Sequence, residues 1–163
     1  MNSLTTIYIK VLDNHSLDLK LNEWRQANNK VVFTNGVFDL LHLGHIDYLS
    51  KAKDCGDILV VGVNSDISAK RLGKGSNRPI TDEKSRSMII AALQFIDAVI
   101  LFDEDTPLEL IKVVQPDVLV KGSDYKPEDI VGYDVVMAKG GTINTIEFLP
   151  GYSTTSIEQK IKG

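Results

Sequence analysis

Two histidines separated by two residues are the side chains in this sequence best suited to bind an anion. His42 and His45 lie within Thr34–Leu49, which reads TNGVFDLLHLGHIDYL. This stretch leaves an apolar run, turns at Gly36 and becomes helical near Gly44. A helix N-terminus offers unpaired N–H groups and a partial positive charge, and a glycine lets a phosphate approach the backbone. The pattern predicts a phosphate site to which both imidazoles donate hydrogen bonds.

The same histidine pair could also be structural, or half of a zinc site. Zinc takes three or four protein ligands, but the chain has one further histidine, His15, and one cysteine, Cys55. We therefore expect no metal site built by the protein itself. A lone cysteine cannot form an intramolecular disulfide, which fits a reducing cytoplasm.

The composition is that of a soluble globular domain. A chain of 163 residues with 43% hydrophobic content suits one domain with its own core. Its net charge of −4 argues against a broad electrostatic field that would hold nucleic acid or an anionic membrane. Anionic substrates must then meet local cations such as Arg71, Lys74 and Arg78. We find no signal peptide and no apolar run long enough to span a bilayer.

Short apolar runs alternate with helical patterns along most of the chain. Five runs have the character of strands buried on both faces: Lys30–Gly36, Asp57–Asn64, Ala98–Phe102, Val118–Val120 and Thr142–Phe148. Helices are expected between and after them, at Gly44–Lys53, Asp82–Phe95, Pro107–Val114 and Thr155–Ile161. This order predicts an α/β fold, a Rossmann-like five-stranded parallel sheet with helices on both faces. Ligands bind such sheets beyond the carboxyl ends of the strands, where the strand order reverses.

Two helical segments carry more detailed expectations. The helix at Asp82–Phe95 should be capped by Thr81 and bury four apolar side chains: Met88, Ile89, Ala92 and Leu93. Residues 1–29 look like an N-terminal helical extension to a domain spanning 30–163. Within that extension Leu17–Ala27 has an apolar stripe of Leu17, Leu21 and Trp24, which predicts either packing or a dimer contact.

The motif around the two histidines resembles the signature of the cytidylyltransferase-like nucleotidyltransferases. That signature is Gly-x-Phe-Asp-x-x-His-x-Gly-His, and the residues that match it are Gly36, Phe38, Asp39, His42, Gly44 and His45. A second motif of this family is a Ser/Thr run that opens the last helix, and Gly151–Ile157 resembles it. The two motifs are more than 100 residues apart, and both fall at predicted helix N-termini.

A more specific resemblance is to the adenylyltransferase domains of ADP-heptose synthesis. It rests on VNSDISAKRLGKGSNRPI at Val63–Ile80, FDEDTP at Phe102–Pro107, PDVLVKGSDYKPEDIVG at Pro116–Gly132 and STTSI at Ser153–Ile157. The resemblance implies transfer of AMP from ATP to a heptose 1-phosphate with release of pyrophosphate. It also implies Mg²⁺ carried with ATP, a homodimer, and a separate sugar kinase that supplies the acceptor.

The resemblance also implies roles for individual residues. The catalytic residues would be His42, His45 and Lys74. Nucleotide-binding residues would be Thr34, Asn35, Gly36, Phe38, Gly44, Arg86, Lys121, Gly122, Asp124, Ser153, Thr154, Thr155 and Ser156. Acceptor-binding residues would be Asp39, Asp66, Arg71, Arg78 and Tyr125. We expect Asp39 either to orient its turn or to touch the acceptor.

Two other functions remain open from the sequence. One is a cytidylyltransferase acting on glycerol 3-phosphate or a similar phosphorylated alcohol. Such enzymes carry an arginine a few residues before the Ser/Thr run, where this chain has Phe148–Pro150. The other is a nucleotide-binding regulatory domain without catalysis, which would have no need of both imidazoles.

Overall fold

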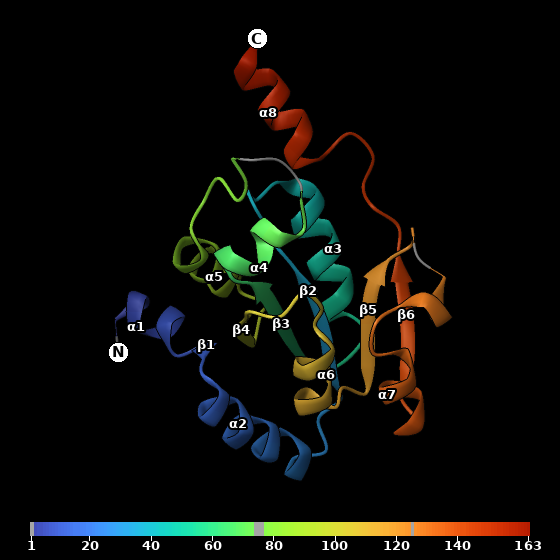
Figure 1. The fold of residues 1–163 in the computed structure, drawn as a ribbon. Helices are drawn as coiled ribbons and strands as arrows, with labels where there is room; N and C mark the ends of the chain where they lie inside the picture. Colours follow the sequence, from blue (N-terminus) through green and yellow to red (C-terminus); the bar gives the residue numbers. More distant parts are fainter. Residues whose placement is uncertain (1, 74–76, 125) are drawn as a thin grey trace.

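The fold is a single twisted sheet of six parallel strands between two layers of helices (Figure 1). The computed structural model describes residues 2–73, 77–124 and 126–163. The strand order is β1-β4-β3-β2-β5-β6. The strands are β1 (Val11–Leu12), β2 (Val31–Gly36), β3 (Ile58–Asn64), β4 (Ala98–Phe102), β5 (Val118–Gly122) and β6 (Thr142–Ile146). The predicted α/β fold is confirmed, while the predicted number of strands is wrong by one.

The unpredicted strand is β1, which lies in the segment expected to be a helical extension. Its two residues pair in parallel with β4, Val11 with Val99 and Leu12 with Ile100. So short a strand leaves no alternating pattern to detect. Helices α1 (Ser3–Tyr8) and α2 (Asn14–Gln26) flank it, and α2 matches the predicted helix, capped by the Asp13 carboxylate on the Ser16 N–H.

Side chains that alternate along the strands fill two separate cores, one on each face of the sheet. On β2, Val31 and Phe33 point to the face covered by α2, α6 (Leu108–Val114) and α7 (Tyr133–Ala138). Val32 points to the opposite face, covered by α3 (Leu43–Lys53) and α5 (Glu83–Ala91). Helices therefore cover both faces, as predicted.

The apolar stripe of α2 belongs to the first of these cores. Leu17 and Leu21 are fully buried and Trp24 nearly so, packed with residues of the sheet and of α6. Of the two sequence expectations for this stripe, packing is correct. The stripe offers no surface to a second subunit.

Helix α5 begins one residue later than predicted and turns a different face inward. Its N-cap is Asp82, whose carboxylate accepts from the Ser85 N–H, and not Thr81. Ile90 and Ala91 are buried, whereas Ile89 and Ala92 are exposed. The prediction placed the stripe one position out of phase, about 100° around the helix.

Several short elements had no sequence signal strong enough to predict. They are α4 (Asp66–Arg71), the 3₁₀ turn η1 (Pro127–Asp129) and α7. The last helix, α8 (Thr154–Lys162), lies beyond the carboxyl ends of the strands, near the start of α3 (Figure 1). None of the helices in the described ranges is both long and apolar enough to cross a bilayer.

The sheet opens at its carboxyl edge between β2 and β5. Pairing between β2 and β3 continues to Gly36 and Val63, but pairing between β2 and β5 stops at Phe33 and Leu119. The chain runs outward from β2 in both directions, through β3 to β4 and through β5 to β6. This is the reversal of strand order at which open α/β sheets bind ligands.

Candidate active site

A cavity of about 800 Å³ lies over the carboxyl ends of β2 to β6. Most of the residues assigned to the site from sequence line it: Asn35, Gly36, Phe38, His42, Gly44, His45, Arg78, Lys121, Gly122, Asp124, Ser153, Thr154 and Thr155. The cavity thus joins the two motifs, although they are far apart in the sequence. Lys74 and Tyr125 lie outside the described residues.

The two imidazoles of the motif stack on each other in this cavity. The ring centroids of His42 and His45 are 3.8 Å apart, and their planes differ by 20°. Both Nδ1 atoms are buried and have no hydrogen-bond partner among the residues that the structure describes. Burial lowers the pKa of His42, and burial together with the neighbouring His42 lowers the pKa of His45 to about 4. The free pair is therefore neutral at pH 7, and a bound polyphosphate would raise both pKa values.

The start of helix α3 carries no side-chain cap. His42 is the N-cap residue, but its side chain makes no capping hydrogen bond. The N–H groups of Leu43 and Gly44 have no partner among the described residues and can bind an anion, whereas that of His45 donates to the His42 carbonyl oxygen. A Cβ at Gly44 would lie 3.0 Å from the His42 ring and 3.1 Å from the Tyr152 Cβ. Glycine at this position lets the imidazole and the segment before α8 close on the helix start.

The Ser/Thr run at the start of α8 has mainly local partners. Ser153 and Ser156 form a capping box, in which each side chain bonds the backbone N–H of the other. The Thr154 hydroxyl donates to the Asp39 carbonyl oxygen at 2.7 Å. Thr155 is exposed and lines the cavity. Three of the four hydroxyls therefore hold the helix start in place, and Ser156 does not line the cavity.

Lys121 spans the opening between β5 and β2. Its ammonium group donates to the Asn35 side-chain oxygen. Burial lowers the pKa of Lys121 to about 8, against the opposing influence of Asp124. The lysine is thus mainly charged at pH 7, and its pKa lies only about one unit above that pH. It is a cation held at the crevice between the diverging strands.

Aromatic side chains form the wall of the cavity near β6. Phe148 packs against Tyr48, with ring centroids 5.8 Å apart, and a Cβ at Gly122 would lie 2.3 Å from the Phe148 ring. Tyr48 also shares a 2.8 Å hydrogen bond with the buried Thr34 hydroxyl. Thr34 therefore supports the wall from below and does not line the cavity. Burial raises the pKa of Tyr48 to about 12, so its hydroxyl stays protonated.

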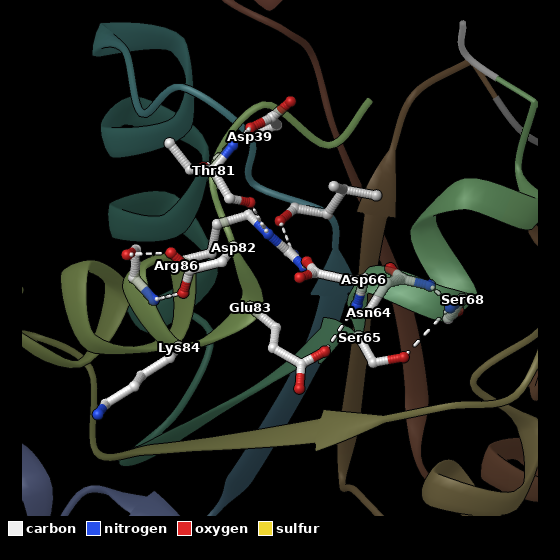
Figure 2. Close-up of polar contacts among 12 residues, drawn as sticks. Asp39, Asn64, Ser65, Asp66, Ser68, Thr81, Asp82, Glu83, Lys84 and Arg86 are labelled. Atoms are coloured by element: carbon white, nitrogen blue, oxygen red, sulfur yellow. Dashed lines mark hydrogen bonds and ion pairs between the residues drawn. The ribbon is translucent and has the colours of Figure 1, made fainter. Parts of the chain in front are cut away.

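Asp39 is buried and orients its turn, the first of the two roles expected for it. Its carboxylate accepts from the N–H groups of Ile80 and Thr81 and from the Thr81 hydroxyl, at 2.8 to 3.0 Å (Figure 2). Burial by itself would raise the pKa of Asp39, but these hydrogen bonds and nearby Arg78 outweigh it and lower the pKa. Asp39 does not line the cavity, and its assignment to the acceptor stays a prediction.

Arg86 is also directed away from the cavity. Its side chain is fully buried and donates to the carbonyl oxygens of Thr81 and Val37 and to the Asp66 carboxylate (Figure 2). Neither Arg86 nor Asp66 lines the cavity, and their assignments to nucleotide and acceptor stay predictions. They tie α5 and α4 to the loop that carries the histidine motif.

The two remaining arginines differ in position. Arg71 does not line the cavity, and its guanidinium binds the Asp105 carboxylate and the Asp103 carbonyl oxygen. Arg78 does line the cavity, and its Nε and Nη2 groups donate to the two carboxylate oxygens of Glu158 on α8. Direct acceptor binding stays a prediction for both arginines, and only Arg78 lines the cavity.

Sequence reasoning missed part of the cavity lining. Asn64 at the end of β3, and Asp105 and Thr106 after β4, face it. Phe148 and Tyr152 face it from the other side. All five lie within segments quoted above, but residues in a loop give no local sign of the direction in which their side chains point.

Comparison with known proteins identifies the family. A family model described as cytidylyltransferase-like matches residues 33–160. The chain belongs to the cytidylyltransferase-like family. Its match runs from the end of β2 to α8, and so includes both sides of the cavity.

Curated relatives of this cytidylyltransferase-like chain are larger proteins. The bifunctional protein HldE of Wolinella succinogenes is 47% identical over 94% of this chain, and that of Geobacter metallireducens is 58% identical over 84%. The chain spans only 31% and 28% of their lengths.

Two solved structures of other proteins have a similar fold. A lipopolysaccharide core biosynthesis protein from Thermoplasma volcanium is 35% identical, with a TM-score of 0.60 over 74% of this chain and 97% of that protein. A pantoate-beta-alanine ligase from Francisella tularensis is 16% identical with a TM-score of 0.62, over 93% of this chain and 76% of that protein. The second likeness bears on the fold alone.

The cavity contains no ready-made metal cage. Within the described ranges, no three His, Cys, Asp or Glu side chains come together to hold a metal ion. A divalent cation at this site would have to take most of its ligands from a bound polyphosphate.

Proposed function

We propose that this chain transfers AMP from ATP to a heptose 1-phosphate, giving ADP-heptose and pyrophosphate. The observation that carries the proposal is the stacked pair of His42 and His45 at the uncapped start of α3, inside the cavity. Family membership supports nucleotidyl transfer. The HldE relatives and the lipopolysaccharide core biosynthesis protein support a sugar acceptor that is used for a surface glycan.

The reaction needs stabilisation of charge more than it needs a base. An oxygen of the acceptor phosphate, already an anion, attacks the α-phosphorus of ATP and forms a new P–O bond. The bond from that phosphorus to the bridging oxygen breaks, and pyrophosphate leaves with the electron pair. No proton has to be removed, so catalysis consists of positioning and of hydrogen bonds to the charge that develops on phosphorus.

Each part of the cavity has a task in this reaction. His42, His45 and the α3 N-terminus would bind phosphate oxygens, and Lys121 and Arg78 would supply positive charge. We also assign Lys74 to the triphosphate and Tyr125 to the acceptor, on the resemblance alone. Mg²⁺ bound to the triphosphate would offset part of its charge.

The place of the reaction in the cell and its partners follow from its chemistry. A kinase must make the sugar phosphate, and we place both reactions in the reducing cytoplasm, to which the free thiol of Cys55 is suited. The expected homodimer stays a prediction, and light scattering at micromolar concentration tests it.

The proposal is tested by the ratio of kcat/KM for ATP to that for CTP, with heptose 1-phosphate as acceptor and pyrophosphate release as the readout. We expect ATP to be preferred. A preference for CTP, or for glycerol 3-phosphate as acceptor, would replace this proposal with the cytidylyltransferase alternative. Absence of turnover with every triphosphate and sugar phosphate would favour a regulatory nucleotide-binding domain.

A further inference from the structure

One side of the cavity has no role in the function proposed so far. Asn64 follows β3, and Asp105 and Thr106 follow β4. Because the strand order is β4-β3-β2-β5-β6, these three residues lie to one side of the histidine pair, which follows β2. Phe148, which follows β6 and packs against Gly122 of β5, lies to the other side. Two substrates that react beside the histidines must occupy one side each.

The chemistry of the two sides indicates which substrate each one takes. The side near β6 presents the aromatic ring of Phe148, which suits the flat face of a base. The side near β3 and β4 presents an amide, a carboxylate and a hydroxyl within a small area. These groups accept and donate hydrogen bonds in the combination that a polyhydroxylated ligand requires.

Asn64 has an unused hydrogen-bonding atom in this area. Its side chain lines the cavity, and the residue is only 4% exposed. The amide nitrogen donates to the Ser68 hydroxyl at 2.9 Å (Figure 2). The amide oxygen accepts from none of the residues that the structure describes. This oxygen is not among the fully buried atoms without a partner, so it is open to solvent and can accept from a ligand or from water.

Asp105 is held in position by α4. The Arg71 guanidinium binds its carboxylate through Oδ1 and also binds the Asp103 carbonyl oxygen. The Ser68 hydroxyl donates to the Glu104 carbonyl oxygen at 2.7 Å. Three consecutive residues of the loop are thus fixed to one helix. Oδ2 of Asp105 accepts from no residue in the described ranges, which leaves it for a ligand.

We infer that Asn64, Asp105 and Thr106 form the subsite that binds the hydroxyl groups of the acceptor sugar. Arg71 is then a positioning residue that acts through Asp105. The inference deepens the proposed function and rests on it. Selection of a sugar phosphate over glycerol 3-phosphate comes from this subsite, because the shorter alcohol has fewer hydroxyls to offer these groups.

The first test is Asp105→Ala with Glu104→Ala as its control. Glu104 is an exposed carboxylate of the same loop whose side chain does not line the cavity. We expect Asp105→Ala to raise the KM for the sugar phosphate by about tenfold or more, the usual effect of losing a hydrogen bond to a charged group. The KM for ATP should change by less than about twofold. Equal effects of the two substitutions, or a rise in the KM for ATP alone, would overturn the assignment.

Asn64→Ala gives a second test, with Asn144→Ala as its control on the exposed edge strand β6. We expect the KM for the acceptor to rise in Asn64→Ala and to stay unchanged in Asn144→Ala. For Arg71, we expect Arg71→Ala to raise the KM for the acceptor and Arg71→Lys to restore most of it. A loss of thermal stability with unchanged KM values in either case would show a purely structural role and contradict the inference.

Failure of this inference can be told from failure of the proposed function. Wild-type turnover with ATP and heptose 1-phosphate decides the proposed function. The ratio of variant to wild-type KM decides the subsite, and it is measured with whichever sugar phosphate the wild-type chain accepts. Unchanged ratios for every such acceptor would exclude the subsite even if turnover itself is confirmed.

Discussion

Individual side chains in the cavity are held in states that suit a ligand more than the free protein. Burial lowers the pKa of both His42 and His45, and the neighbouring His42 lowers that of His45 further; both Nδ1 atoms are unpartnered among the described residues. Lys121 is a half-buried cation that donates to the neutral Asn35 side chain. The negative charge of a polyphosphate bound between them would favour protonation of the imidazoles. It would also pair with the ammonium group of the lysine. The residue chemistry therefore favours a strongly anionic ligand.

Loss of either imidazole tests this at the residue scale. We expect His42→Ala and His45→Ala each to lower kcat by at least about a hundredfold, since one donor to transition-state charge is worth about that much. The KM for ATP should change little, because the donors act mainly on the transition state. Steady-state kinetics with purified variants measures both constants. His15→Ala, a change in the first turn of α2, is the control, and near-normal kcat in either motif variant would remove the central assignment.

The pH dependence of stability gives an independent test of His45. Its pKa is lowered from an ordinary 6.5 to about 4, so between these values the folded chain holds fewer protons than the unfolded chain. Stability is therefore fully present above pH 6.5 and falls as the pH is lowered toward 4. We expect the urea midpoint to decline over this window and to decline less steeply in His45→Gln. An identical slope in both proteins would contradict the buried neutral histidine.

At the scale of elements, hydrogen bonds between loops and helix starts hold the site together. Asp39 joins the histidine loop to residues 80–81 through its carboxylate and to α8 through its carbonyl oxygen. Arg86 joins α5 to the same loop through the Val37 carbonyl oxygen and to α4 through Asp66 (Figure 2). The loop includes Phe38 and Leu40 with positive φ, a backbone conformation that side-chain-bearing residues rarely adopt. The hydrogen bonds made by Asp39 and Arg86 explain how the loop retains this unusual backbone conformation.

Arg86→Met should be strongly destabilising. The substitution leaves two carbonyl oxygens and the Asp66 carboxylate without their donor in a buried place. We expect a loss of about 3 kcal/mol in the free energy of unfolding, measured by urea denaturation. Lys112→Met removes an exposed ion pair with Glu109 on α6 and should cost less than about 1 kcal/mol. Similar losses in the two variants would show that the Arg86 network contributes little.

At the scale of the whole molecule, the N-terminal segment is part of the sheet and of one core. β1 forms the edge of the sheet beside β4, and α2 places Leu17, Leu21 and Trp24 against the face that also receives α6. The sequence analysis placed a domain boundary after residue 29. That boundary would separate the edge strand β1 from the sheet to which it pairs. We propose that the whole chain folds as one unit.

Truncation tests this unity. Removal of residues 1–29 should abolish cooperative thermal unfolding and cause aggregation, since it uncovers the face on which α2 packs. Removal of residues 1–8 takes away only α1, which contains no buried residue, and should preserve a cooperative transition. Circular dichroism during heating measures the unfolding transition of both truncated chains. A stable, cooperative 30–163 fragment would instead support the smaller domain expected from the sequence.

Local sequence patterns were enough to predict the five main strands and the helices α2, α3, α5, α6 and α8, and they place the expected phosphate site at the start of α3. These follow from local patterns: runs of β-branched residues, apolar periodicity, and a glycine between two histidines at a helix start. Boundaries agree to within a few residues; for example Ala98–Phe102 matches β4 in full, while β6 ends two residues before its prediction.

Only the tertiary structure decided which polar residues face the cavity. Asp39, Asp66 and Arg86 turn toward buried partners of their own, whereas Asn64 and Asp105 face the space where a substrate would lie. The edge strand β1 and the inward direction of the α2 stripe were settled in the same way, by pairing with β4 and packing on the sheet. The physical reason is that a local pattern sets the face and period of an element. The partner of a charged or polar side chain depends on residues brought close by folding, often more than 30 positions away in the chain.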